Sequence, residues 1–217
     1  MDQIRIGFIG DSITHGTGDE TLLGWPLRVG QAERGNGHDV VVYNIGVRAD
    51  TSELAAARWE AECAARLQPA YRCATVFALG INDSAHEKSP ERDGVRVPLE
   101  QSAPRMIGMI QAARRFGASL WVGPTPVVED MMPLSPFAGL SFNFSNADIA
   151  RYNAAYGEQA AAAGIPYLDL YTPFSRDSRW EACLRASDGL HPNAEGYQMM
   201  AQQVGAWPAW RAMLAGK

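Results

Sequence analysis

Hydrophobic runs alternate with amphipathic stretches along most of the chain. Five short runs rich in β-branched or aromatic residues predict buried strands, and they lie at 4–10, 39–45, 73–79, 118–123 and 165–170. Apolar residues at helical spacing predict helices between them, at 25–35, 52–67, 99–116, 146–163, 180–184 and 193–206. Strands that alternate with helices favour right-handed crossovers. The predicted fold is therefore an α/β/α sandwich in three layers, with a mostly parallel five-stranded sheet and the first strand central.

Two long connections interrupt this alternation. Residues 82–98 are rich in charge, and we expect them to be irregular. Residues 124–146 contain four prolines and several large apolar side chains. Connections of this length inside a compact domain are usually functional.

Composition narrows the class of protein. The chain has 217 residues, 47% of them hydrophobic, which is enough for one sizeable core, and we expect a single domain over 1–217. A formal net charge of −5 argues against a nucleic-acid partner or binding to an anionic membrane. No apolar run approaches the roughly 20 residues that a membrane helix needs. The sequence does not indicate an oligomeric state.

The cysteines and the N-terminus suggest a compartment. Cys63, Cys73 and Cys183 are scattered and match no zinc-ligand spacing, so we expect buried free thiols. The first strand begins close to Met1, and no signal-peptide pattern precedes it. We therefore expect a cytoplasmic protein, although removal of a signal peptide before Met1 would leave the same sequence.

The first strand leads into a glycine-rich turn that contains Ser12. Gly10, Gly16 and Gly18 allow the backbone to turn sharply there. Ser12 then lies just beyond the carboxyl end of a buried strand, where open α/β sheets bind their ligands. In the alternative interpretation, Ser12 or Thr14 only caps a helix.

Other polar residues follow the later strands. Gly46 ends the second strand, Asn82 follows the third, and Asp188 and His191 follow the fifth strand and its short helix. Carboxyl ends of parallel strands share one edge of the sheet, so these residues are expected to converge there. Taken one at a time, each motif also fits a local turn with no chemical role.

Together these residue types suit acyl transfer. A serine hydroxyl needs a base to remove its proton, and His191 can serve Ser12 in this way. Asp188 can fix the tautomer of the same imidazole. An oxyanion needs donors already aimed at it, and the backbone N–H groups of Ser12 and Gly46 and the side-chain amide of Asn82 are the candidates.

The same positions resemble the four sequence blocks of the SGNH (GDSL-type) hydrolases. The blocks are Gly10-Asp11-Ser12-Ile13-Thr14, Gly46, Gly80-Ile81-Asn82-Asp83, and Asp188-Gly189-Leu190-His191-Pro192 with the residues that follow. The resemblance implies a flavodoxin-like sheet and a serine esterase, with Ser12 as nucleophile, Asp188 and His191 completing the triad, and Ser12, Gly46 and Asn82 forming the oxyanion hole. It implies no metal and no organic cofactor. Many relatives have a glycine a few residues after the block-two glycine, where this chain has Ala49.

We therefore predict a serine esterase that acts on small-molecule esters through an acyl-enzyme, with short acyl or acetyl esters as substrates. Lysophospholipid or thioester hydrolysis is the alternative within the family. A non-catalytic flavodoxin-like binding protein is the alternative outside it, although the first turn matches neither a P-loop nor GxGxxG. An inactive hydrolase is disfavoured because every catalytic position is present. We expect residues 131–144 to wall the substrate pocket, and we assign Arg48 to a surface ion pair.

Overall fold

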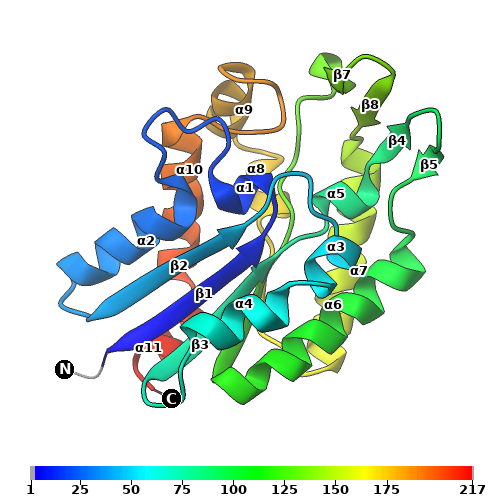
Figure 1. Ribbon diagram of the computed structural model, residues 1–217. Coiled ribbons are helices and arrows are strands. Elements are labelled where there is room, and N and C mark those ends of the chain that lie inside the picture. Colours follow the sequence, from blue (N-terminus) through cyan, green and yellow to red (C-terminus); the bar gives the residue numbers. More distant parts are fainter. Residues whose placement is uncertain (1–2, 217) are drawn as a thin grey trace.

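The computed structural model describes residues 3–216 and is built on a parallel sheet of five strands (Figure 1). The strand order is β2-β1-β3-β6-β9, which is the flavodoxin-like order. β1 lies inside the sheet between β2 and β3, and β3 takes the middle position. The predicted fold class is confirmed. The strands are β1 (Ile4–Gly10), β2 (Val40–Gly46), β3 (Arg72–Ala78), β6 (Ala118–Val122) and β9 (Tyr167–Leu168).

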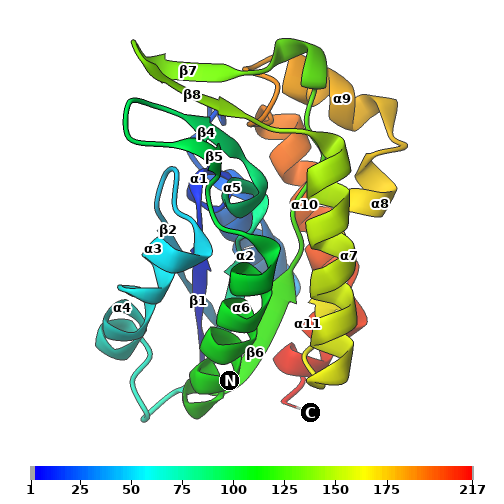
Figure 2. The same ribbon diagram turned by 90° about the vertical axis from the view of Figure 1, so that its right-hand side faces the viewer.

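Two layers of helices cover the sheet (Figure 2). Alternate residues of β1 face opposite layers, so Ile6 and Phe8 join one hydrophobic cluster while Ile9 joins the other. One layer holds α2 (Gly24–Gly35), α10 (Ala194–Ala206) and α11 (Pro208–Leu214). The other holds α3 (Ser52–Ala56), α4 (Trp59–Arg66), α6 (Leu99–Ala113) and α7 (Asn146–Ala162).

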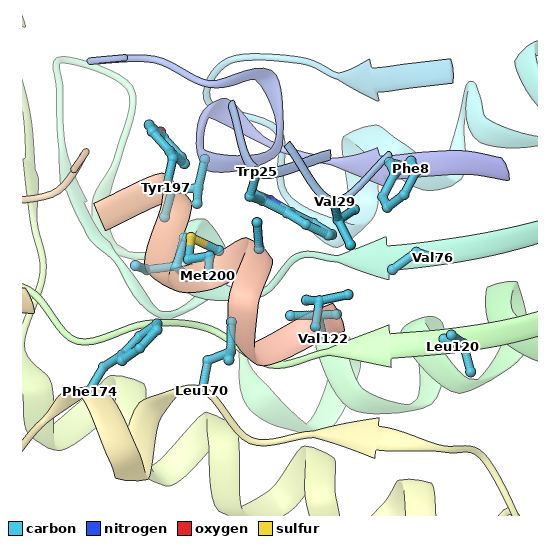
Figure 3. Close-up of a cluster of buried hydrophobic side chains, with 14 of the residues drawn as sticks. Phe8, Trp25, Val29, Val76, Leu120, Val122, Leu170, Phe174, Tyr197 and Met200 are labelled. Carbon is cyan, nitrogen blue, oxygen red and sulfur yellow. The ribbon is translucent and has the colours of Figure 1, made fainter. Parts of the chain in front are cut away.

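Large side chains fill the space between the sheet and α2 and α10 (Figure 3). Phe8 meets Trp25 edge to face, with the ring centroids 5.2 Å apart. Tyr197 and Met200 of α10 lie in the same cluster. This packing fixes both β1 and α10, and Ser12 and His191 lie beside the ends of these two elements.

The two long connections contain strands that the sequence pattern did not indicate. They form a second sheet, antiparallel, in the order β5-β4-β8-β7, which we call the accessory sheet. The expectation that residues 82–98 are irregular is wrong, because three-residue strands show no period and β4 depends on pairing with the distant β8. Figure 2 shows the accessory sheet beyond the carboxyl ends of the parallel strands. Its strands are β4 (His86–Lys88), β5 (Asp93–Val95), β7 (Leu134–Phe137) and β8 (Leu140–Asn143).

The helices differ from the prediction in smaller ways. The single helix expected over 52–67 is divided into α3 and α4, and the long helix after Pro98 ends in a 3-10 turn. The fifth strand is only two residues long, because residues 165–166 and 169–170 on either side of it have no regular secondary structure. The remaining elements are α1 (Ser12–His15), α5 (Ile81–Ser84), α8 (Tyr171–Phe174), α9 (Ser178–Arg185), η1 (Arg114–Phe116) and η2 (Glu129–Met131).

The cysteines behave as expected, since Cys63, Cys73 and Cys183 are buried and free. Burial raises the pKa of the Cys63 thiol to about 12, which keeps it protonated and unreactive. Of the helices described between residues 3 and 216, none combines the length and the apolar character that crossing a membrane requires.

Candidate active site

Ser12 begins α1, the short helix that follows β1. Asp11 caps this helix, and its Oδ1 accepts the Ile13 N–H at 2.9 Å. Gly16 ends it with a φ of +95°, a conformation that glycine adopts without strain. The capping role that the alternative interpretation gave to Ser12 or Thr14 therefore belongs to Asp11. The Ser12 side chain remains available for chemistry.

Asp11 is buried, and its carboxyl is perturbed. Burial raises its pKa to about 7, although the Ile13 N–H and the nearby His191 act in the opposite direction. The carboxyl faces the backbone of its own turn. We interpret Asp11 as a structural brace of the Ser12 turn.

His191 and Asp188 lie in the turn between α9 and α10. Asp188 Oδ1 accepts the backbone N–H groups of Leu190 and His191 at 3.0 and 2.8 Å, and Oδ2 lies 2.7 Å from His191 Nδ1. Gly189 has a φ of +83°, which allows the chain to fold back tightly. Burial alone would raise the pKa of Asp188, but the hydrogen bond and charge of His191 with the two backbone N–H groups lower it to about 2. The carboxylate is therefore ionised at neutral pH.

The structure brings Ser12 and His191 together from opposite ends of the chain. Ser12 Oγ lies 2.7 Å from His191 Nε2, and both residues are buried. When Asp188 accepts a hydrogen bond from Nδ1–H, Nε2 is left as an acceptor for the serine hydroxyl. This chain of hydrogen bonds is the arrangement in which an imidazole can deprotonate a serine.

Asn82 lies on α5, directly after β3. Its Nδ2 is buried and has no hydrogen-bond partner among the described residues. Buried polar groups are rarely left unpaired, so this amide is poised for a group from outside the protein. The neighbouring Asp83 accepts the Ser52 N–H at 2.7 Å and the hydroxyl of Ser102, which holds the Asn82 turn against α3 and α6.

Gly46 does not reach this site as the sequence suggested. Its N–H donates to Asn44 Oδ1 at 3.0 Å and is therefore already occupied. A Cβ at this position would collide with the backbone of Asp11 and His15. Gly46 is thus required so that α1 can pack closely against the end of β2, and the prediction that it is an oxyanion donor needs correction.

Ala49 is the residue that the sequence reasoning missed. It lines the same cavity as Ser12 and Asn82. Its φ is +64°, the left-handed region, which costs an alanine about 1–2 kcal/mol. Neither the Ala49 N–H nor the Ser12 N–H donates to any other atom of residues 3–216. The signal was the place of Ala49 where many relatives carry glycine, the residue that adopts a positive φ most readily.

These groups open into one cavity of about 320 Å³. The accessory sheet forms its apolar wall, as expected for residues 131–144. Arg48 is exposed at this cavity and has no carboxylate within 4.0 Å among residues 3–216, so the predicted surface ion pair is wrong. The lining residues are Ser12, Arg48, Ala49, Asn82, Leu134, Ser135, Pro136, Phe142, Phe144, Asp188, Leu190 and His191.

A larger hollow of about 520 Å³ lies beside α8 and α9, and none of the candidate catalytic residues lines it. Within residues 3–216, His, Cys, Asp and Glu side chains form no group of three that could hold a metal ion. The hydroxyl, imidazole and carboxylate of Ser12, His191 and Asp188 are suited to proton transfer and hydrogen bonding.

Comparison with known proteins adds a family match. The sequence model of the GDSL-like Lipase/Acylhydrolase family matches residues 8–199. A search of curated protein sequences finds no match.

Several solved structures share the fold. A lipase/acylhydrolase from Enterococcus faecalis superposes with a TM-score of 0.72 at 22% identity, over 97% of each chain. A variant of an acetyl-xylooligosaccharide esterase from Geobacillus has a TM-score of 0.70 at 16% identity, over 94% of this chain and 95% of that one. A carbohydrate acetylesterase family member from Sinorhizobium meliloti has a TM-score of 0.66 at 19% identity, over 99% and 100%.

Proposed function

Because the chain belongs to the GDSL-like lipase/acylhydrolase family and is a serine ester hydrolase, we propose that it cleaves short-chain acyl esters, acetyl esters included, with Ser12, His191 and Asp188 as its catalytic triad. The observation that carries this proposal is the 2.7 Å contact between Ser12 Oγ and His191 Nε2, continued by the 2.7 Å contact between His191 Nδ1 and Asp188. We also propose that the chain acts as a single domain, because both hydrophobic clusters pack on one sheet.

The proposed reaction has two stages. His191 Nε2 takes the proton of Ser12 as Oγ attacks the ester carbonyl, and it then gives that proton to the departing alcohol. Asp188 stabilises the imidazolium that forms in between. Water, activated by the same imidazole, then attacks the acyl-enzyme, releases the acid and restores the Ser12 hydroxyl.

The oxyanion is proposed to rest on three donors. They are the backbone N–H groups of Ser12 and Ala49 and the side-chain amide of Asn82. All three residues line the cavity, and all three donors lack a partner among the described residues. Donors that are fixed before the reaction stabilise the transition state without reorganising.

Replacement of Asn82 by alanine is expected to lower kcat about 10²–10³-fold, the usual cost of one oxyanion donor. KM is expected to change little, because the donor contributes mainly in the transition state. Steady-state kinetics with p-nitrophenyl acetate measures both constants. Asn143→Ala, on the exposed end of β8, is the matched control and should keep wild-type kinetics. A kcat within threefold of wild type would remove Asn82 from the oxyanion hole.

Small esters fit this cavity best. Its volume lies at the lower end of the range for small-molecule sites, and its apolar wall suits a short acyl chain. Two of the fold neighbours, an acetyl-xylooligosaccharide esterase and a carbohydrate acetylesterase family member, support the same class. A panel of p-nitrophenyl esters, acetylated sugars, acyl-CoA and lysophospholipid tests the choice. If kcat/KM is highest on lysophospholipid or acyl-CoA, the enzyme is instead a lysophospholipase or a thioesterase of the same family. If the protein hydrolyses none of these esters and does not react with a fluorophosphonate, a non-catalytic binding protein is favoured.

The accessory sheet is expected to set chain-length preference. Leu134 of β7 lines the cavity, so Leu134→Ala should lengthen the pocket and raise the kcat/KM ratio of hexanoyl over acetyl ester about fivefold. Each buried methylene contributes about 0.8 kcal/mol. Phe137→Ala is the control, because Phe137 lies on the same strand but is 73% exposed. The profile is measured with esters that differ in the acyl chain and with esters that differ in the alcohol. If Leu134→Ala changes neither the acyl-chain preference nor the alcohol preference, this wall does not contact the substrate.

A further inference from the structure

Ala49 has a conformation that needs support from its surroundings. An L-residue keeps a positive φ only where the rest of the structure holds it there. Before Ala49, the Val47 N–H donates to the Gly10 carbonyl at 3.0 Å and ties the loop to β1. After it, Asp50 pairs with Arg58 at 2.6 Å. The Ala49 peptide itself lies between these two anchors.

Arg96 provides a third anchor, and it comes from the accessory sheet. It follows β5, and its Nη2 donates to the Ala49 carbonyl oxygen at 2.9 Å. Its Nε lies 3.4 Å from Glu87 of β4, and its guanidinium carbon lies 4.9 Å from the centroid of the Phe142 ring on β8. Arg96 therefore contacts the loop of Ala49 and a wall residue of the cavity at the same time.

Burial of this guanidinium carries a cost that calls for an explanation. The side chain is only 10% exposed, and Nη1 is buried without a partner among the described residues. Burial lowers the pKa of Arg96, and Glu87 opposes that shift. A buried cation with one nitrogen unpaired is rarely a source of stability. What the arrangement does provide is a fixed hydrogen bond to Ala49.

We propose that Arg96 is a positioning residue for catalysis. It holds the backbone of Ala49 so that the Ala49 N–H stays directed to the oxyanion. The two rotatable bonds of Ala49 separate its N–H from its carbonyl. A fixed carbonyl oxygen therefore restricts the directions that the N–H can take. Through Phe142, the same guanidinium couples this donor to the wall against which the substrate packs. The inference rests on the proposed role of Ala49 as an oxyanion donor.

Arg96→Met keeps the apolar part of the side chain and removes its hydrogen-bond donors. We expect kcat for p-nitrophenyl acetate to fall about tenfold, with KM within twofold of wild type. Lys88→Met is the matched control, because Lys88 lies exposed on β4 and its loss changes the net charge equally. That control should keep wild-type kinetics.

Rescue by glycine separates positioning from general stability. Glycine takes a positive φ without strain, so Ala49→Gly should make the loop less dependent on Arg96. In the Arg96→Met background, Ala49→Gly is expected to restore kcat to within threefold of wild type. Because Ala49→Gly also relieves the strain of the positive φ and so stabilises the protein, thermal unfolding is measured for each variant. Rescue of kcat among variants that are fully folded at the assay temperature reports positioning.

Arg96→Lys provides the same test if the methionine variant does not fold. Lysine keeps the charge but lacks the planar guanidinium that contacts Ala49 and Glu87 at the same time. We therefore expect a kcat about threefold below wild type, which Ala49→Gly restores. Wild-type kcat in either variant, or a loss that Ala49→Gly does not restore, would overturn the inference. Fluorophosphonate labelling of the wild-type protein, and its absence in Ser12→Ala, tests the proposed function independently of this outcome.

Discussion

Replacement of Ser12 by alanine is expected to lower kcat for p-nitrophenyl acetate by about 10⁵–10⁶-fold and to abolish labelling by a fluorophosphonate. The hydroxyl is the group in contact with His191 Nε2, at 2.7 Å, and without it no acyl-enzyme forms. Folding should be preserved, because Asp11 rather than Ser12 caps α1. Turnover, mass-spectrometric labelling and thermal unfolding measure the three effects.

The double variant Ser12→Ala/His191→Ala tests whether the two residues act as one unit. Members of such a unit are strongly non-additive, so the double variant should be no more than threefold slower than Ser12→Ala alone. Ser135→Ala is the matched control, because Ser135 lines the same cavity but makes no hydrogen bond to His191, and it should keep both turnover and labelling. Labelling that survives in Ser12→Ala would place the nucleophile elsewhere.

The sequence was sufficient for the parallel core because its signals are local. Apart from the half-buried Arg5, the run Ile4–Gly10 is apolar on both faces, as a strand between two helical layers must be, and it is buried in the structure. The prediction that Ser12 meets His191 needed one further step. Parallel strands place their carboxyl ends at one edge, so residues at opposite ends of the chain meet there.

The accessory sheet lay outside this reasoning because its stability depends on pairing between distant segments. His86 pairs with Asn143, and neither short strand has an apolar face long enough to show a period of two. Residues 131–144 were nevertheless expected to wall the pocket, because the connection 124–146 that contains them is long and rich in apolar residues. Leu134 and Phe142 line the cavity, as that expectation required.

The loop that contains Gly46 and Ala49 shows where a prediction based on residue type alone fails. Gly46 is a glycine for packing reasons, since the backbone of α1 lies where its side chain would be. The position at the cavity carries Ala49, which adopts the backbone conformation usual for glycine. A conformation of this kind depends on contacts such as the Arg96 hydrogen bond, which no local pattern reveals.

Replacement of Asp188 by asparagine is expected to lower kcat about 10⁴-fold while the fold is retained. Oδ1 of Asp188 accepts two backbone N–H groups, so the amide oxygen of an asparagine should keep that place. The amide NH₂ then faces His191 Nδ1 and donates to it. The imidazole is thereby fixed with its proton on Nε2, the nitrogen that must accept the proton of Ser12.

Asp177→Asn is the matched control for this prediction, because Asp177 caps α9 through the Arg179 N–H and makes the same change in charge away from the cavity. Its kcat should stay within twofold of wild type. Single-turnover kinetics with p-nitrophenyl acetate should show the Asp188→Asn defect in the acylation step, where His191 first acts as a base. An Asp188→Asn enzyme within tenfold of wild type would mean that the carboxylate braces the turn without setting the tautomer.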